Sequence, residues 1–368
     1  MKAFYPAFVA PCLFALTACA TTAPATSTPP AITPSNYAVT ASVSPEAQAI
    51  YNKLLPLVLK KRAAQGTAHT AEEFEKRREE TLAQTVPAAE ALLKSLNVTA
   101  IDKTMGGVAV VVTTPPGYQD DRTVLIHVHG GGFVGDSARG SVGLDARIGI
   151  LTGKRIVSVD YTVAPKGKWE QVTDEVISVY KTLLAEGYAP GAIGMFGDSA
   201  GGNIVSTSTL KMRDQGIATP AALVLLSPGT DFTQSGDTSM TLRYADPALG
   251  TEDLQAMFTQ YAEPADWKNP YVSPIYGDFT KGFPPTLIQV GTKEMLLSDS
   301  VRLYQAIKTA GGDAELDVYE GMPHVFHTYM QDTPEQKAAF AEIKRFLSAH
   351  VVAPKQKKAQ RVRRSSRS

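Results

Sequence analysis

The feature that most constrains the fold is an alternation of short apolar runs and helical stretches from about residue 106 onward. Runs of four to six apolar residues are typical of strands that are buried on both faces. When such runs alternate with helices, the sequence predicts a mostly parallel sheet with helices on both sides. The expected strands span 108–113, 124–128, 156–159, 193–196, 223–226, 287–290 and 314–319, and the expected helices span about 170–185, 201–214, 298–310 and 334–350.

Residues 44–95 have a helical pattern that no strand precedes. Ser44-Pro45-Glu46 has the form of an N-cap followed by proline at the first helical position. A second, highly charged helix is expected over about 71–90. Because these helices stand outside the alternation, residues 44–105 are interpreted as a helical cap and residues 106–352 as the catalytic domain.

The strongest chemical signal is Gly197-Asp198-Ser199-Ala200-Gly201, which follows the strand expected at 193–196 and begins a helix. A G-x-S-x-G sequence between a strand and a helix is typical of a nucleophile elbow. Glycines allow the tight turn that exposes the serine hydroxyl, and the start of the helix favours a developing oxyanion. The motif therefore predicts Ser199 as a nucleophile.

A glycine-rich loop, His129-Gly130-Gly131-Gly132-Phe133, directly follows the strand expected at 124–128. Consecutive glycines allow several backbone N–H groups to point into one cavity. An HGGG-type loop of this kind is associated with the oxyanion hole of lipases and esterases.

A serine nucleophile needs a base, and the chain has six histidines. His324 and His327 lie late in the chain, after the strand expected at 314–319, which fits the order serine, acid, histidine. We favour His324, which Pro323 places in a rigid loop. The others are assigned elsewhere: His69 to the cap, His127 to a strand in a structural role, His129 to the glycine loop and His350 to the last helix.

Together these motifs resemble those of the hormone-sensitive-lipase family of bacterial esterases, often called family IV. The glycine loop at 129–133 resembles that family's oxyanion loop, and GDSAGG at 197–202 resembles its elbow. The segments at 160–165, 283–291 and 324–326 resemble its D-Y-R-L-A-P, pre-acid and H-x-F segments. The likeness covers about residues 44–350 and implies an α/β-hydrolase fold with an N-terminal helical cap.

The resemblance also implies an activity and a set of site residues. It assigns the oxyanion N–H groups to Gly131, Gly132 and Ala200, gives Asp198 a structural role, and implies hydrolysis of short-chain acyl esters without a metal or organic cofactor. The expected partner is therefore a small-molecule ester. A lactonase or a deacetylase on the same fold is the alternative, because the pocket decides the substrate. A non-catalytic surface lipoprotein is a second alternative.

The third member of the triad has two candidates. Glu294 follows the strand expected at 287–290, at the position where the family usually has aspartate. Asp299 lies at the start of the next helix, where a carboxylate favours the helix dipole. We favour Glu294 as the acid, because alignment through Gly291 places it just past the strand end, and keep Asp299 as the alternative.

The N-terminus has the form of an export signal. Lys2 is followed by a mostly apolar stretch to Ala18, too short to span a membrane. The sequence Leu16-Thr17-Ala18-Cys19 resembles the bacterial lipobox, so residues 1–18 are expected to be a lipoprotein signal peptide and Cys19 a lipid anchor to a bacterial membrane, with the outer membrane facing the periplasm favoured. A soluble periplasmic or secreted protein is the alternative. Residues 19–43, rich in threonine, proline and alanine, suit a tether.

The charges argue against a nucleic-acid partner. Of the 36 basic residues, seven lie in 354–368 and one is Lys2, so 28 face the 36 acidic residues of the body and leave it a net charge of −8. The basic stretch at 353–368 has almost nothing apolar to bury and is expected to be a disordered tail. Both cysteines lie in the first 20 residues, so the body has no cysteine for a disulfide or a metal site. The sequence does not indicate an oligomeric state.

Overall fold

The computed structural model describes residues 41–65, 70–247, 249 and 251–353. The predictions for the signal peptide, the anchor at Cys19, most of the tether and the basic tail lie outside these residues. The sequence expectations for the cap and the catalytic domain fall almost entirely within them.

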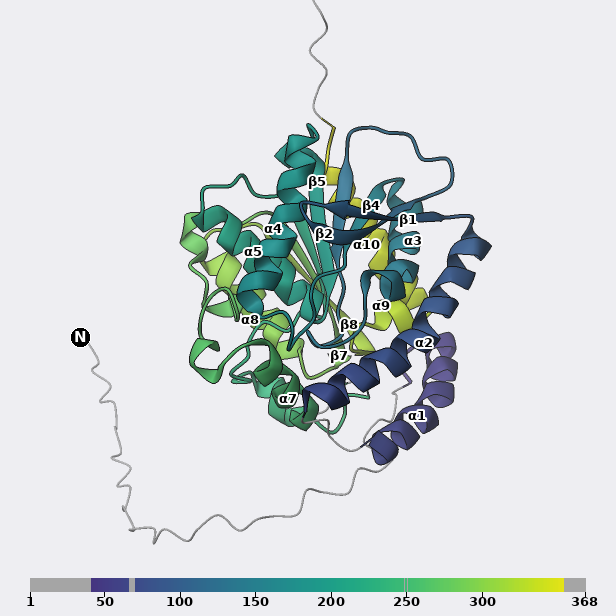
Figure 1. Cartoon of the computed structure of the whole chain (residues 1–368). Coiled ribbons are helices and arrows are strands. Elements are labelled where there is room, and N and C mark those ends of the chain that lie inside the picture. Colours follow the sequence, from purple (N-terminus) through teal and green to yellow (C-terminus); the bar gives the residue numbers. More distant parts are fainter. Residues whose placement is uncertain (1–40, 66–69, 248, 250, 354–368) are drawn as a thin grey trace, which may run out of the picture. The chain divides into compact units, whose positions relative to one another are not determined.

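The centre of the fold is one sheet of eight strands in the order β1-β2-β4-β3-β5-β6-β7-β8 (Figure 1). Pairing is antiparallel between β1 and β2 and between β2 and β4, and parallel in all the other pairs. This confirms the α/β-hydrolase fold with a mostly parallel sheet. The strands are β1 Thr99–Met105, β2 Val108–Thr114, β3 Val124–Val128, β4 Arg155–Val159, β5 Ile193–Asp198, β6 Ala222–Leu226, β7 Thr286–Lys293 and β8 Ala314–Pro323.

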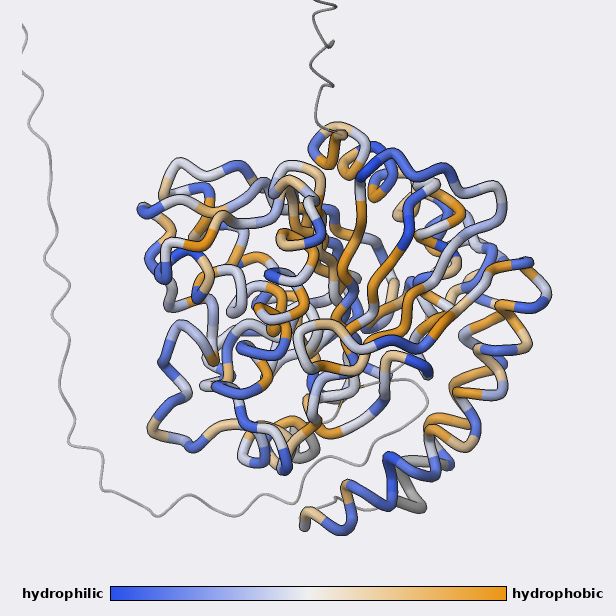
Figure 2. Tube along the Cα trace, turned by 45° about the horizontal axis from the view of Figure 1, so that its top comes forward, coloured by the Kyte–Doolittle hydropathy of each residue, from blue (hydrophilic) through white to orange (hydrophobic). Residues whose placement is uncertain are grey.

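Helices cover both faces of the sheet. The ten α-helices of the described chain are α1 Pro45–Gln65, α2 Ala71–Leu96, α3 Ala138–Thr152, α4 Trp169–Ala185, α5 Ala200–Asp214, α6 Asp237–Thr241, α7 Thr251–Tyr261, α8 Leu297–Thr309, α9 Phe326–Tyr329 and α10 Pro334–His350. Apolar residues of α4, α5 and α8 share one core cluster, and those of α3 and α10 share another. Figure 2 shows the apolar segments gathered in the central strands. Every residue of β3 and of β6 is buried, as expected for strands covered on both faces.

Helix α2 is longer than the expected 71–90 and has strong signals at both ends. Thr70 and Glu73 form a capping box at its start, and Asn97 ends it in the left-handed conformation. On its inner face Phe74, Ala89 and Leu93 are buried. Helices α1 and α2 lie at the same side of the sheet as α7 (Figure 1).

The sheet begins earlier than the sequence analysis expected. Strand β1 lies within 44–105, the stretch assigned to the helical cap, but it pairs with β2 over seven residues. Only Met105 of this strand is buried, so the strand lacks the apolar run by which the others are recognised.

Candidate active site

The nucleophile elbow has the backbone that its sequence predicts. Ser199 lies between β5 and α5 with φ 51° and ψ −119°, a strained conformation for a residue with a side chain. A Cβ atom at Gly197 would lie 2.5 Å from the backbone of Gly201, and one at Gly201 would lie 1.9 Å from the carbonyl oxygen of Val128. Only glycine fits at either position, so the turn lifts Ser199 away from the sheet.

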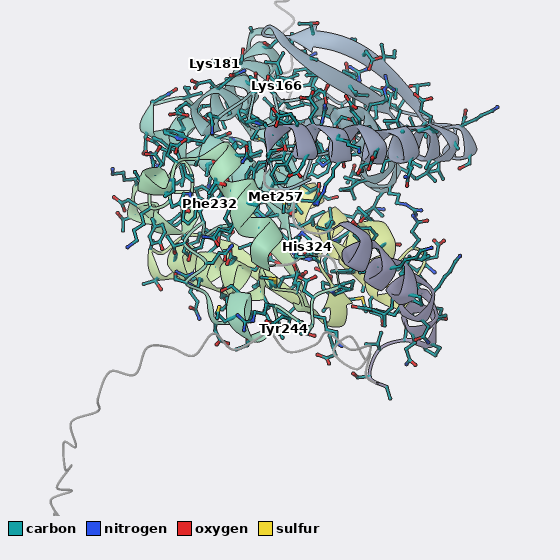
Figure 3. The ribbon with its side chains drawn as sticks, turned by 60° about the horizontal axis from the view of Figure 1, so that its bottom comes forward. Lys166, Lys181, Phe232, Tyr244, Met257 and His324 are labelled. Carbon is teal, nitrogen blue, oxygen red and sulfur yellow. The ribbon has the colours of Figure 1, made fainter. Side chains whose placement is uncertain are left out.

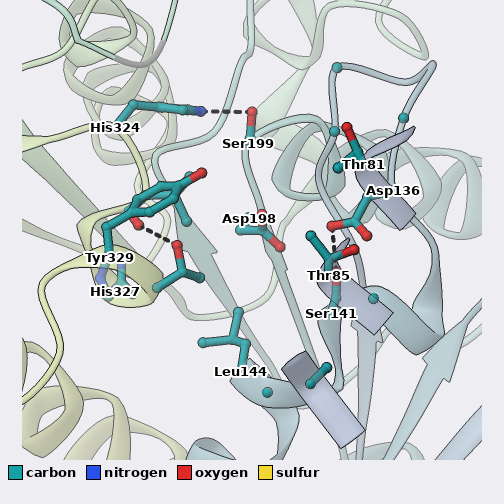
Figure 4. Close-up of a pocket in the computed structure, with 18 of the residues that line it drawn as sticks. Thr81, Thr85, Asp136, Ser141, Leu144, Asp198, Ser199, His324, His327 and Tyr329 are labelled. Atoms are coloured by element: carbon teal, nitrogen blue, oxygen red, sulfur yellow. Dashed lines mark hydrogen bonds between the residues drawn. The ribbon is translucent and has the colours of Figure 1, made fainter. Parts of the chain in front are cut away.

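His324 follows the last residue of β8 and lies between a hydroxyl and a carboxylate. Its Nε2 is 2.9 Å from Ser199 Oγ (Figure 4). Its Nδ1 is 2.9 Å from Glu294 Oε2. Burial alone would lower the pKa of this histidine, but the hydrogen bond and charge of Glu294 outweigh burial and raise it. The ring therefore has the orientation that a base for Ser199 needs: a proton on Nδ1 donates to the Glu294 carboxylate and leaves Nε2 to accept from the serine hydroxyl.

Glu294 directly follows β7 and is fully buried. Its Oε1 accepts hydrogen bonds from Ser227 Oγ at 2.9 Å and from the backbone N–H of Gly291 at 2.5 Å, which leaves Oε2 for His324. Ser227 Oγ also accepts the N–H of Val325 at 3.1 Å. This serine, which the sequence analysis did not identify, therefore joins the acid to the histidine loop.

Asp299 makes no hydrogen bond to His324, and it has a structural role beyond the expected one at the start of the helix. It lies in the first turn of α8, but Leu296 occupies the cap position and makes no side-chain cap. Instead Asp299 Oδ2 accepts the backbone N–H groups of Thr230 and Asp231, at 2.6 and 2.9 Å. Asp299 thus holds the loop that follows β6, a long-range contact that local helix-capping rules do not predict.

The oxyanion loop is positioned by two neighbours. The hydroxyl of Tyr161, from the segment at 160–165, donates to the carbonyl oxygens of His129 and Gly130 at 3.1 and 3.3 Å. The carboxylate of Asp198 accepts the N–H of Gly130 at 3.2 Å. Within the described residues, the N–H groups of Gly131, Gly132 and Ala200 make no hydrogen bond to the protein, so they are available to an oxyanion beside Ser199.

His327 lies near His324 but has a different environment. Its Nε2 is 3.0 Å from Gln289 Oε1, and burial lowers the pKa of the ring to about 3. It is therefore neutral and bonded to an amide, away from Ser199. This agrees with the preference for His324 over His327.

A cavity of about 920 Å³ opens above Ser199 and His324. One wall is a stripe along α2 at helical spacing, which includes Phe74, Arg78, Thr81 and Thr85. Opposite walls come from the oxyanion loop, α3, α7 and α9. In Figure 3 Met257 and His324 lie close together on the face that is turned forward, and both line this cavity. Apolar lining side chains include Val134, Leu144, Leu249, Leu254 and Met257, and polar ones include Arg77, Arg78, Thr81, Asp136, Ser141 and Arg147.

Helix α1 supports the loop that carries His324. The hydroxyl of Tyr51 donates to the carbonyl oxygen of Gly321 at 2.9 Å. Val43, just before α1, occupies the space where a Cβ atom of Gly321 would lie. The backbone N–H and hydroxyl of Ser44 both donate to Glu335, at 2.8 Å. The N-terminal helix is thus anchored on the base's loop and on α10.

The described residues lack two kinds of feature, one for metal binding and one for crossing a membrane. They contain no cluster of three or more His, Cys, Asp or Glu side chains arranged to bind a metal ion. In the same part of the chain, no helix has both the length and the apolar character needed to cross a bilayer.

Comparison with known proteins places these features in a family. A family model described as alpha/beta hydrolase fold matches residues 125–328. An acetyl-hydrolase of Streptomyces hygroscopicus is 33% identical over 232 residues, which cover 63% of this chain and 77% of the relative. An esterase of Acinetobacter venetianus is 33% identical over 230 residues, 61% of this chain and 75% of the relative.

Solved structures agree over a larger part of the chain. The crystal structure of esterase E25 matches with a TM-score of 0.76 and 30% identity, over 85% of this chain and 96% of that one. An esterase from the bacterial hormone-sensitive lipase family matches with a TM-score of 0.72 and 32% identity, over 84% of this chain and 99% of that one.

Proposed function

Because the chain belongs to the hormone-sensitive-lipase-like bacterial esterases of the α/β-hydrolase fold and is an ester hydrolase, we propose that it cleaves short-chain acyl esters through an acyl-enzyme on Ser199. The observation that carries this proposal is the position of His324. One ring nitrogen lies 2.9 Å from the Ser199 hydroxyl and the other lies 2.9 Å from the Glu294 carboxylate.

The proposed reaction has two halves. His324 accepts the hydroxyl proton as Ser199 Oγ attacks the ester carbonyl carbon, and the tetrahedral oxyanion forms near the N–H groups of Gly131, Gly132 and Ala200. His324 then donates that proton to the leaving alcohol. Water, activated by the same histidine, hydrolyses the acyl-enzyme and restores Ser199. The Glu294 carboxylate accepts the Nδ1–H and stabilises the imidazolium.

The preference for short acyl chains is supported by the cavity walls. The apolar side chains of the lining are interrupted by Arg77, Arg78, Thr81, Asp136 and Arg147. A long alkyl chain would cover these polar groups and remove their hydration without replacing it by hydrogen bonds. An acetyl to octanoyl group fills less of the cavity and leaves them in water.

The test is a series of p-nitrophenyl esters from C2 to C16, measured with the wild-type protein and with Ser199→Ala. We expect kcat/KM to be highest between about C2 and C8. Loss of the nucleophile should lower kcat by roughly 10⁴-fold or more while thermal unfolding stays unchanged. Faster turnover of C16 than of C4 contradicts the chain-length proposal. Activity of Ser199→Ala within tenfold of the parent contradicts the nucleophile.

A second candidate is removal of acetyl groups from a natural hydroxylated compound, with a lactone as a further possible substrate. It is favoured by the polar side chains of α2 that line the cavity, which are Arg77, Arg78, Thr81 and Thr85, and by the relative named acetyl-hydrolase. Acetylated sugars and lactones should be compared with butyl acetate, which shares the acyl chemistry but offers no hydroxyl groups. Higher kcat/KM for butyl acetate than for every acetylated sugar and lactone excludes this candidate.

For the location of the protein, we propose export and a lipid anchor at Cys19, with the outer membrane facing the periplasm favoured. The support is the lipobox-like Leu16-Thr17-Ala18-Cys19 and the following tether. Cys19→Ser should release the protein into a soluble fraction or block its maturation. Mass spectrometry of the mature N-terminus distinguishes a lipid-anchored protein from a soluble exported one, because any first residue other than acylated Cys19 rules out the anchor.

A further inference from the structure

A second buried histidine lies behind the nucleophile, and the mechanism above does not use it. His127 is in β3 and none of its surface is exposed. Its ring stacks on Phe196 of β5, with 4.4 Å between centroids and 5° between planes. A polar ring in such a position requires partners for its nitrogen atoms, since an unsatisfied buried polar group is costly.

Both nitrogens of His127 face carboxylates. Nδ1 is 2.7 Å from Asp145 Oδ1, and Nε2 is 3.3 Å from Asp198 Oδ1. A neutral imidazole has only one N–H and would present a lone pair to one of these carboxylates. The doubly protonated ring matches both carboxylates, and Ser158 Oγ also lies 3.4 Å from Nδ1. The contact with Asp145 is an ion pair rather than an aligned hydrogen bond, and Ser158 of β4 donates to the second oxygen of that carboxylate.

The charges around the ring favour the same state. Burial alone would lower the pKa of His127, but Asp145 of α3 and then Asp198 of β5 outweigh burial and raise it to about 9. The neighbouring His129 does not compete for the proton, because burial lowers the pKa of its ring. His127 therefore remains an imidazolium at neutral pH.

This imidazolium lies where three parts of the active site meet. Asp198 immediately precedes Ser199, and its Oδ1 accepts both His127 and the N–H of Gly130, the residue before the oxyanion glycines. A Cβ atom at Gly130 would lie 2.4 Å from Asp198 Oδ2, so the elbow and the glycine loop are in contact. Asp145 belongs to α3, whose Ser141 and Leu144 line the cavity.

We propose that His127 is a positioning residue for the oxyanion hole: its Nε2–H holds Asp198 against Gly130, and its ion pair with Asp145 ties the elbow to α3. These contacts fix the distance between Ser199 and the N–H groups of Gly131 and Gly132. The inference rests on the proposed reaction at Ser199. Without the imidazolium, Asp198 loses its charged partner, and the loop and the elbow are free to separate. Misplacement of an oxyanion donor weakens transition-state binding more than substrate binding.

The test uses Asp145→Asn, which keeps the size of the side chain and removes only the charge that faces Nδ1. Asp145 does not line the cavity, so a direct contact with substrate is excluded. We expect kcat for p-nitrophenyl acetate to fall by about tenfold or more, a fraction of the roughly 10²–10³-fold measured when an oxyanion donor is removed. KM should stay within twofold. Affinity for a trifluoromethyl ketone, which forms a tetrahedral adduct on the serine, should fall by the same factor as kcat.

Lys154→Met is the matched control. Lys154 is a buried charge beside the opposite end of β3, and its Nζ donates to Thr123 Oγ1 at 2.7 Å. This variant should lose stability and keep kcat. If Asp145→Asn does not fold, Ser158→Ala removes the hydroxyl donor to the same carboxylate and takes its place.

Three outcomes overturn the inference: parent-like kcat in the folded variant, a rise in KM with kcat unchanged, or an equal fall of kcat in Lys154→Met. Failure of the proposed function is distinct, because it appears as absence of esterase activity in the wild-type protein or as retained activity in Ser199→Ala.

Discussion

The structure buries two histidines against carboxylates, and they differ in what faces the second ring nitrogen. At His324 one nitrogen meets Glu294 and the other meets the hydroxyl of Ser199. At His127 both nitrogens meet carboxylates. The pKa of each ring is raised, although burial opposes the shift in both cases. A carboxylate partner is therefore not enough to make a base, because the ring must also keep one nitrogen for the group that it deprotonates.

Removal of the charge of Glu294 should have the largest effect on activity, because His324 then loses the carboxylate that supports it as a base. Glu294→Gln keeps an acceptor at this position, but the amide cannot stabilise the imidazolium that forms as Ser199 attacks. We expect kcat to fall by roughly 10³–10⁴-fold, as measured when a triad aspartate is made an amide. Steady-state kinetics with p-nitrophenyl acetate, together with a thermal unfolding curve, give the answer. Near-parent kcat in this variant would remove Glu294 from the triad.

The pH profile should separate the two histidines. His324 must be neutral to accept a proton, so kcat/KM should rise with pH through its pKa, above the ordinary value of 6.5. His127 must be charged, so activity should fall again as pH rises through about 9. In Glu294→Gln the acid limb should move to lower pH, because the main cause of the raised pKa is gone. A limb that stays in place would show that another group controls it.

The free energy of unfolding, like activity, should fall as His127 loses its proton at high pH. Its folded pKa lies above the unfolded value, so its contribution is complete below about pH 6.5 and is lost as pH rises through about 9. Chemical denaturation at several pH values measures this. In Asp145→Asn the loss should be smaller and should be complete at a lower pH than in the wild type, because the folded pKa of His127 moves toward the unfolded value. Identical curves for the two proteins would contradict the raised pKa.

Substitution of Asp299 should give the smallest effect. This buried carboxylate bonds to backbone N–H groups and, within the described residues, contacts no histidine, so it serves as a comparison for Glu294 and Asp145. Asp299→Asn can still accept the two N–H groups of the loop at 230–231 through its amide oxygen. We expect a loss of about 1 kcal/mol in the free energy of unfolding and kcat within twofold of the parent. A large fall in kcat here, with near-parent kcat in Glu294→Gln, would exchange the roles of the two acids.

The sequence predicts elements well where one physical signal dominates. The buried parallel strands, the elbow and the glycine loop have local patterns, and each lies where the pattern places it. Strand β1 has one buried residue in seven and no apolar run, so the hydrophobic pattern does not predict a strand there. Helix α3 contains Gly140, Gly143 and Gly149, which lower its helical propensity, although it packs against α2 and against strands β2 and β4.

Local sequence patterns do not predict the contacts between distant segments of the chain. The choice between Glu294 and Asp299 rested on spacing and stays a prediction, although the structure places only the Glu294 carboxylate at 2.9 Å from His324. The partners of His127 could not be predicted, because Asp145 occupies an unremarkable position in the middle of a helix. Ser227 likewise shows its bonds to Glu294 and Val325 only when β6, β7 and the histidine loop are brought together.

The contact of the N-terminal helix with the histidine loop has a consequence for recombinant production. A shortened protein that lacks the N-terminal residues ahead of α1 should still begin before Val43, whose buried side chain lies against Gly321, three residues ahead of His324. Burial of a valine side chain is worth about 1.5–3 kcal/mol. A shorter version would lose that contribution together with the Ser44 bonds to Glu335, and the loss would fall on the turn that carries His324 rather than on a remote surface. Low specific activity of such a preparation would then reflect where it was cut, and not the enzyme itself.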